Sequence, residues 1–375
     1  MNFFLRPFVA EERGAMGDFF EIDFLDVETD KSGDAITVHY ELNGHEFIHV
    51  VDAGFQASGA GVVRHIRAHY GALKPVNHVV VTHSDGDHTG GVRTILEEMV
   101  VGELWMLRPW RYASEIIHRF ENYTSVDRLS SRLKSIYSNL AALEEIAEKK
   151  GIPIREPFQG AAIGAFTVLA PTKPRYLDLI VQSEKTPEAS EMLAAEAANI
   201  FELAKAHIVN LVKRVWGAET FPADGTSAEN EMSVVQYANL CGERILLTGD
   251  AGRDAMSEAA DYAPFVGLAL PGIDRIQVPH HGSRHNVSSE ILDRWLGPKL
   301  SAMPKKGEES FTAICSSAKA DRDHPRKSVH RAFVHRGAKF LATESQSIRT
   351  QQNAPKRDGW TAIEARPYPE DEEED

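Results

Sequence analysis

Apolar and polar residues alternate near the start of the chain in a pattern that is typical of β-strands. The pattern predicts strands over residues 19–27, 35–40 and 46–51. Apolar residues then recur at helical spacing over residues 61–70, 91–99 and 130–150, and Gly151 follows as a residue suited to end the last of these helices. Strands that alternate with helices favour a layered α/β fold.

A short apolar run, Val79–Val81, predicts a buried strand that leads into the most informative segment of the chain. Residues 83–88 read His-Ser-Asp-Gly-Asp-His, and Thr-Gly-Gly follows at once. Imidazole nitrogen and carboxylate oxygen are ligands for zinc, manganese and iron. Because a strand that ends in such a turn can aim several of these groups at one point, the segment predicts a metal site.

Three further strands are predicted to end in residues of the same kind. The strand over residues 49–54 carries Asp52 at its end, and the strand over 244–250 ends in Gly-Asp. The strand over 276–283 ends in the pair His280-His281, followed by Gly-Ser. Each strand thus delivers a metal ligand, or a residue that supports one, to its end.

These motifs, in this order, resemble those of the metallo-β-lactamase fold superfamily. The His-His-Gly-Ser form, with Asn-Glu-Met-Ser at 230–233 ahead of the Gly-Asp strand, is most similar to the soluble hydrolase domain of ComEC-type competence proteins. The resemblance covers roughly residues 17–350. It implies an αββα four-layer sandwich: two mixed sheets face to face, helices outside, and metals at one sheet edge.

The resemblance also implies a ligand set for one or two divalent ions, Zn²⁺ or Mn²⁺ or else Mg²⁺. His83 and Asp85 would face one metal, Asp87 and His88 the second, and Asp250 would bridge both. His281 is favoured over His280 as the ligand that closes the second site. His280 would then lie beside the metals as a proton donor or phosphate contact, and Asp87 or Asp250 would accept the proton of the attacking water.

Two departures from the common family pattern change the picture of the first site. Asp85 stands where the family usually has a second histidine, and no clear ligand histidine lies between this motif and Asp250. The two candidates, His118 and His207, lie in amphipathic, helix-like surroundings typical of ordinary structural histidines. The first site is therefore expected to be rich in oxygen, which suits manganese or magnesium as well as zinc.

Other residues are expected to support the site or to contact the substrate. Asp52 would orient a metal-binding histidine, or else cap a turn at the strand end. Asn230 would satisfy loop backbone near the site. The remaining candidates, which could hold an anionic substrate or be ordinary loop residues, are Ser283, Arg284, His285 and His324.

Composition and charge limit the classes of function and the cellular location that we expect for the chain. The chain of 375 residues has a formal net charge of −14, which argues mildly against broad nucleic-acid binding. Residues 311–366 nevertheless carry eleven Lys/Arg against five Asp/Glu. No stretch reaches the roughly eighteen apolar residues of a membrane span, the start lacks a secretory pattern, and the two cysteines form no C-x-x-C pair. We therefore expect a cytoplasmic protein.

One segment does not fit the minimal pattern of the resembling domains. Residues 174–229 read as a helical insertion, in which Thr186-Pro187-Glu188 predicts the start of a helix that runs to about Trp216. The insertion packs on the domain, covers the substrate or binds a protein partner. The expected organisation is a lead-in at 1–16, one domain at 17–366 and an acidic disordered tail at 367–375.

Three functions remain open at this point. The ComEC-like motifs, the oxygen-rich site and the basic C-terminal third favour a metal-dependent phosphodiesterase or nuclease that uses metal-activated water on nucleic acid or another phosphodiester. A hydrolase of a small ester, lactone or amide would need a closed, more apolar pocket. A partner-gated effector module would use the insertion as its docking face.

Overall fold

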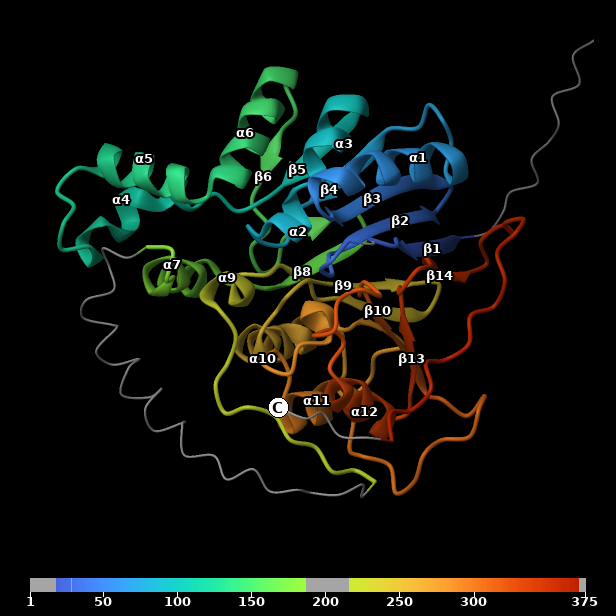
Figure 1. Cartoon of the computed structure of the whole chain (residues 1–375). Coiled ribbons are helices and arrows are strands. Elements are labelled where there is room, and N and C mark those ends of the chain that lie inside the picture. Colours follow the sequence, from blue (N-terminus) through green and yellow to red (C-terminus); the bar gives the residue numbers. More distant parts are fainter. Residues whose placement is uncertain (1–17, 28, 187–215, 371–375) are drawn as a thin grey trace, which may run out of the picture.

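The computed structural model describes residues 18–27, 29–186 and 216–370. Two seven-stranded mixed sheets lie face to face, and helices cover the outer face of each (Figure 1). The first sheet has the strand order β14-β1-β2-β3-β4-β5-β6, and the second has the order β13-β12-β11-β10-β9-β8-β7. This is the metallo-β-lactamase fold, so the predicted fold class is confirmed.

The strands of the first sheet are β1 (Phe19–Phe24), β2 (Ala35–Leu42), β3 (His45–Ala53), β4 (Val76–Val80), β5 (Val101–Trp105), β6 (Ile154–Arg155) and β14 (Ile348–Gln352). Those of the second are β7 (Ala162–Ile163), β8 (Phe166–Ala170), β9 (Val235–Leu240), β10 (Glu243–Leu247), β11 (Arg275–Gln277), β12 (Phe311–Cys315) and β13 (Ala338–Ala342).

The helices are α1 (Gly59–His69), α2 (Gly86–Thr89), α3 (Val92–Glu98), α4 (Ala113–Ile116), α5 (Val126–Ile136), α6 (Ser138–Lys150), α7 (Lys173–Gln182), α9 (Ala228–Glu231), α10 (Arg253–Tyr262), α11 (Ser289–Leu296) and α12 (Lys327–His335). In the part of the chain that the structure describes, none of them has the length and apolar character needed to cross a lipid bilayer.

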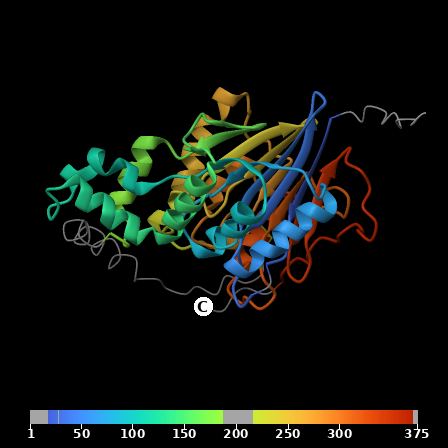
Figure 2. The ribbon, with the colours of Figure 1, turned by 90° about the horizontal axis from the view of Figure 1, so that it is seen from above.

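Three apolar cores separate the four layers. Figure 2 shows the chain from above, from the side of the helices that cover the first sheet. One core lies between the two sheets and contains Phe20, Tyr40 and Phe166. A second joins the first sheet to helices α1, α3 and α6, and a third joins the second sheet to helices α10, α11 and α12. Each sheet is therefore buried on both faces, which explains why strands such as β8 and β12 are largely apolar.

Parallel pairing brings the ends of the motif-bearing strands to one edge of the sandwich. Strand β3 pairs with β4 in parallel, and β10 pairs with β11 in parallel. The carboxyl ends of parallel strands meet at the same edge, and ligand-bearing loops of α/β folds gather there. The sequences that follow β4, β10 and β11 therefore converge, although they are far apart along the chain.

Two sequence predictions about secondary structure differ from the fold, and a third lies outside the described residues. The helix predicted over 130–150 is two helices, α5 and α6, because Tyr137 has a non-helical backbone and is buried in the core. Gly151 does end α6 in the left-handed conformation. The strand predicted over 276–283 is confined to Arg275–Gln277, since Pro279 begins a 3₁₀ turn. Helix α7 occupies the start of the predicted insertion, and the helix predicted from Thr186 falls on residues 187–215, outside those described.

A buried charge cluster anchors the segment around Glu219. The Glu219 side chain is 0% exposed, and it accepts hydrogen bonds from His335 Nδ1 at 3.0 Å and from Arg336 Nη1 at 2.7 Å. Burial alone would raise the pKa of Glu219, but the hydrogen bonds from His335 and Arg336 outweigh it and lower the pKa to about 2. The cluster ties this segment to helix α12.

We predict that Glu219→Gln lowers the free energy of unfolding by about 3 kcal/mol at pH 7, because it leaves buried cations without their partner. The folded pKa lies below the model-peptide value, so this stabilisation is full above about pH 4.5 and is lost as the pH falls toward 2. Urea unfolding measures both effects. Glu98→Gln, at a half-exposed pair with Arg67, is the control, and equal stability of the two variants would contradict the prediction.

Candidate metal centre

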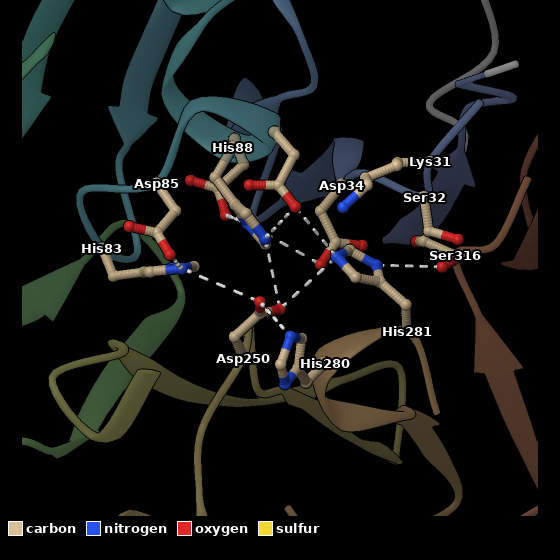
Figure 3. A network of polar contacts seen from close by, with 12 residues as sticks. Lys31, Ser32, Asp34, His83, Asp85, His88, Asp250, His280, His281 and Ser316 are labelled. Atoms are coloured by element: carbon tan, nitrogen blue, oxygen red, sulfur yellow. Dashed lines mark hydrogen bonds and ion pairs between the residues drawn. The ribbon is translucent and has the colours of Figure 1, made fainter. Parts of the chain in front are cut away.

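The His-Ser-Asp-Gly-Asp-His segment forms a tight turn between a strand and a helix. Strand β4 ends at Val80, and Asp85 is the residue that precedes helix α2. His83 therefore lies on the extended part of the turn, while Asp87 and His88 lie in the short helix. The His83 and His88 rings are only 4.3 Å apart at their centroids, so both face the same space (Figure 3).

Asp250 lies at the middle of the centre, directly after strand β10. Gly249 before it has φ +50°, and a Cβ there would lie 2.9 Å from Thr82 Cβ, so only glycine fits this approach of the two loops. The two oxygens of Asp250 face different histidines. Oδ2 lies 3.7 Å from His83 Nε2, whereas Oδ1 lies 3.2 Å from His88 Nε2.

His280 and His281 both turn toward Asp250, although they are neighbours in the chain. Their backbones have φ +47° and +53°, a left-handed conformation that costs about 1 kcal/mol or more per residue. His280 Nε2 lies 3.5 Å from Asp250 Oδ2, and His281 Nε2 lies 3.8 Å from Asp250 Oδ1. The strand rule that neighbouring side chains point to opposite faces does not apply, because β11 has already ended.

The donor atoms therefore fall into two groups that share Asp250. The first group is His83 Nε2, Asp85 Oδ2, Asp250 Oδ2 and His280 Nε2, and the second is Asp87 Oδ2, His88 Nε2, Asp250 Oδ1 and His281 Nε2. Neighbouring atoms within a group are 3.2 to 4.0 Å apart. Two ligands at about 2.1 Å from one ion have this separation. The groups match the sets predicted from the sequence, with His280 added to the first.

Each histidine is held through its Nδ1 atom, so that Nε2 faces the centre. His88 Nδ1 donates to Asp52 Oδ2 at 2.7 Å, and His281 Nδ1 donates to the Ser316 carbonyl at 3.0 Å. The Asn286 amide nitrogen donates to the carbonyl of Asp250, so its oxygen is free to accept from His280 Nδ1 at 2.8 Å. A proton fixed on Nδ1 leaves a lone pair on Nε2, which is the form that binds a metal.

His83 is oriented through a hydroxyl. Thr82 Oγ1 donates to Asp52 Oδ2 at 2.6 Å and lies 3.1 Å from His83 Nδ1, so it accepts the Nδ1 proton. Asp52 also accepts from the Thr82 backbone N–H through Oδ1. The structure thus places Asp52 where it fixes His88 directly and His83 through Thr82, which is the orienting position expected from the sequence.

The histidines and carboxylates of the centre lie close enough to shift one another's pKa values. Burial would raise the pKa of Asp250, but the charges of His88, His280 and His281 outweigh it and hold the pKa well below its usual range. Burial would lower the pKa of His281, but the carboxylates of Asp250 and Asp87 raise it to about 9. Burial and the charge of His88 both lower the pKa of His83. The centre therefore holds ionised carboxylates at neutral pH.

The donor atoms fit a divalent cation. The Nε2 atoms of His83, His88 and His281 and Oδ1 of Asp250 are buried, and none has a hydrogen-bond partner among the described residues. Buried polar atoms without partners are rare and costly in proteins. Because the atoms of His88, His281 and Asp250 converge on one space, a cation bound there would satisfy them. A second cation, on the other side of Asp250, would satisfy His83.

Asp34 joins the second group, although the sequence analysis did not predict it. The side chain is fully buried between the loop before β2 and the centre, and it clusters with His88, Asp250 and His281 at separations within 4.8 Å. Its Oδ2 accepts from Gln277, while Oδ1 has no partner among the described residues. Burial raises its pKa. The missed signal was a Gly-Asp pair at a strand boundary, as at Gly249-Asp250.

The other predicted residues lie around the pair His280-His281. The Asn230 amide lies 3.2 Å from His280 Nδ1. The His324 ring lies 5.7 Å from the His280 ring and 6.1 Å from the His281 ring, and the His324 Nδ1 atom lies 3.2 Å from the Asp321 carboxylate.

The predicted residues that follow the histidine pair make local contacts. The Ser283 hydroxyl accepts a hydrogen bond from the backbone N–H of His285, within the turn. The His285 side chain pairs with Asp224 at the surface. The Arg284 carbonyl accepts from Arg253. Asn286 was not predicted, because an Asn five residues after the histidine pair carries no motif.

His118 and His207, the two candidates for a missing ligand, do not contribute to the centre described. His118 lies in the short 3₁₀ helix Ile117–Arg119 beside α4, and His207 falls within residues 187–215, outside those described. His280 provides instead the additional nitrogen of the first group.

Comparison with known proteins supports this fold. Residues 40–154 match the model of the Metallo-beta-lactamase superfamily, a range that includes the segment from His83 to His88. No curated protein matches the chain.

Solved structures resemble the chain at low identity. They include the Zn²⁺-bound PqqB from Methylobacterium extorquens (8% identity, 88% of this chain and 99% of that chain, TM-score 0.41) and a metallo beta lactamase from Hirschia baltica (13%, 66% and 82%, 0.28). AidC, a dizinc quorum-quenching lactonase, is 10% identical over 58% of this chain, with a TM-score of 0.28. The present chain covers 56% of AidC.

We predict that Asp52→Ala lowers the affinity for Zn²⁺ or Mn²⁺ by about 10- to 100-fold, because His88 and Thr82 lose the carboxylate that orients them. Calorimetric titration of the metal-free protein measures the affinity, and urea unfolding checks that the variant is folded. Asp261→Ala, at an exposed pair with Arg294, is the control. An affinity equal to that of the control would refute the orienting role.

Proposed function

We propose that the protein is a metal-dependent phosphodiesterase that acts on nucleic acid or on another phosphodiester. The observation that carries this proposal is a centre of histidines and carboxylates with an ammonium on one side and a further imidazole, that of His324, on the other. Lys185 lies against Asp85 with Nζ 2.7 Å from Oδ1. On the other side, His324 packs beside His280 and His281, and the Arg326 backbone N–H donates to the carbonyl of Gly282.

The chemistry that one or two divalent ions supply in such a centre is activation of water and neutralisation of negative charge. The first donor group would be His83, Asp85, Asp250 and His280, and the second Asp87, His88, Asp250 and His281, with Asp34 beside it. Asp87 or Asp250 would accept the proton of the attacking water at a carboxylate oxygen. His324 would contact the substrate.

Among the residues that the structure describes, neither the two cysteines nor Ser283 is activated as a nucleophile. Burial raises the pKa of the Cys315 thiol well above its usual value, and the pKa of Cys241 is also raised, chiefly by burial. The Ser283 hydroxyl accepts from the backbone of its own turn. Attack by water is therefore the route that these residues support, and the ComEC-type resemblance of their motifs favours a phosphodiester as the target.

A small ester, lactone or amide is the second candidate substrate class. An apolar recess does lie beside His83, lined by residues that include Val81, Leu107, Leu140 and Tyr176. Its volume is about 20 Å³, which is room for a group of about the size of one water. So small a recess does not accommodate an acyl chain, and this favours the phosphodiester. The partner-gated alternative remains a prediction, because residues 187–215 of the insertion lie outside those described.

We expect the purified protein to cleave plasmid, linear or single-stranded DNA, RNA or bis(p-nitrophenyl) phosphate when Mn²⁺, Mg²⁺ or Zn²⁺ is supplied. Asp250→Ala should abolish cleavage, because Asp250 belongs to both donor groups. Gel electrophoresis and release of p-nitrophenol measure the activity. Folded, metal-loaded protein that cleaves none of these substrates but opens a lactone or ester would contradict the proposal.

His324→Ala should lower kcat/KM for the phosphodiester by about 10- to 100-fold without changing the number of metals bound, because His324 lies beside the centre but outside both donor groups. Steady-state kinetics and metal analysis measure the two quantities. His45→Ala, at the exposed start of β3, is the matched control. Loss of metal together with activity would show that His324 acts on the centre rather than on the substrate.

A further inference from the structure

The carboxylate of Asp85, a member of the first donor group, also pairs with a lysine. Lys185 Nζ lies 2.7 Å from Asp85 Oδ1, while Asp85 Oδ2 faces His83 Nε2 at 3.8 Å. The two oxygens of one carboxylate thus have different partners, a cation of the chain on one side and the donor group on the other. Asp87 and Asp250, by contrast, make their ion pairs with histidines of the centre.

The backbone around Lys185 is fixed by hydrogen bonds to buried groups. The Lys185 backbone N–H donates to Ser183 Oγ at 3.1 Å, and the Ser183 hydroxyl donates to the buried carboxylate of Glu229. The buried Thr186 hydroxyl donates to the carbonyls of Ile180 and Ser183. These bonds anchor the turn after helix α7. The backbone therefore holds the Lys185 ammonium beside Asp85, even though the Lys185 side chain is 44% exposed.

The two donor groups differ in charge for this reason. The second group contains Asp87 and Asp250 and has Asp34 beside it, whereas the first contains Asp85 and Asp250, with the Lys185 charge on Asp85. A cation near a carboxylate weakens the attraction of that carboxylate for a second cation. The first group should therefore bind a divalent ion more weakly than the second.

We propose that the Lys185 ammonium competes with a divalent ion for the carboxylate of Asp85 in the first donor group. It also supplies positive charge to an anionic substrate. The competition follows from the ion pair alone, whereas the contribution to substrate rests on the proposed phosphodiesterase function. An ammonium is a compact point charge on a flexible stem, and it can pass from the carboxylate to a phosphate oxygen.

Metal titration tests the competition without reference to any substrate. Metal-free wild type, Lys185→Met and Lys185→Arg are titrated with Mn²⁺ by calorimetry. Lys185→Met should bind the weaker equivalent about tenfold more tightly, or bind a second equivalent where wild type binds one, because the competing charge is gone. Lys185→Arg keeps the charge and should behave like wild type.

Lys173→Met is the matched control, since Lys173 begins the helix α7 that precedes Lys185, is 42% exposed and pairs with Glu115 at 2.8 Å. It should leave both affinities unchanged. In the Asp85→Asn background, Lys185→Met should no longer tighten metal binding, because no carboxylate remains to be shared. Unchanged or weaker metal binding by a Lys185→Met variant that is as stable to urea as wild type would overturn the proposal.

Hydrolysis of bis(p-nitrophenyl) phosphate at saturating Mn²⁺ tests the contribution to substrate. Lys185→Met should lower kcat/KM about tenfold although it binds metal more tightly, and these opposite changes distinguish the proposal from a structural role, which would weaken both. Equal kcat/KM in the two proteins would overturn the substrate part. If wild type hydrolyses no phosphodiester, the proposed function fails, while the titration still decides whether Lys185 competes for Asp85.

Discussion

The hydrogen bond through Nδ1 of each histidine is the constraint on which the rest of the centre depends. Imidazole has two nitrogens, and only a proton fixed on one of them guarantees a lone pair on the other. Asp52, Thr82, Asn286 and the Ser316 carbonyl provide these fixing contacts for the four histidines. They come from separate loops, so the two sheets must pack in register before the four Nε2 atoms can face the same carboxylate.

The backbone reflects this requirement. His280, His281 and Asp52 all have positive φ, a conformation that non-glycine residues seldom adopt. Such strain persists only where the surrounding structure holds it, and it commonly marks a functional site. Here the surrounding structure is the apolar core on both faces of each sheet, together with the hydrogen bonds of the rings. The stability of the sandwich thus supports a geometry that the isolated turn would not keep.

Much of this arrangement follows from local sequence. The layered α/β class and the ligand residues at the strand ends could be predicted, because short apolar strands and metal-ligand residues leave local patterns. The four-layer arrangement and the position of His83 to His88 beside Asp250 were instead implied by the resemblance of these motifs to the superfamily. Asp34 and Asn286 could not, since each acts through a contact that only the packed sheets create. The break at Tyr137 was also missed, because the helical composition continues through it and the tertiary burial of its ring decides the backbone.

The two donor groups differ in their access to solvent, and this difference suggests which group would meet the substrate. In the second group, the side chains of His88 and His281 are 0% and 3% exposed, and that of Asp87 is 27% exposed. In the first group, Asp85 and His280 are 33% and 25% exposed, and Lys185 lies at this open side. A substrate would therefore reach the first group, while an ion in the second stays enclosed by nitrogen and carboxylate ligands. An anionic substrate would gain most from positive charge on the open side, where the chain supplies an ammonium and any metal is expected to bind more weakly.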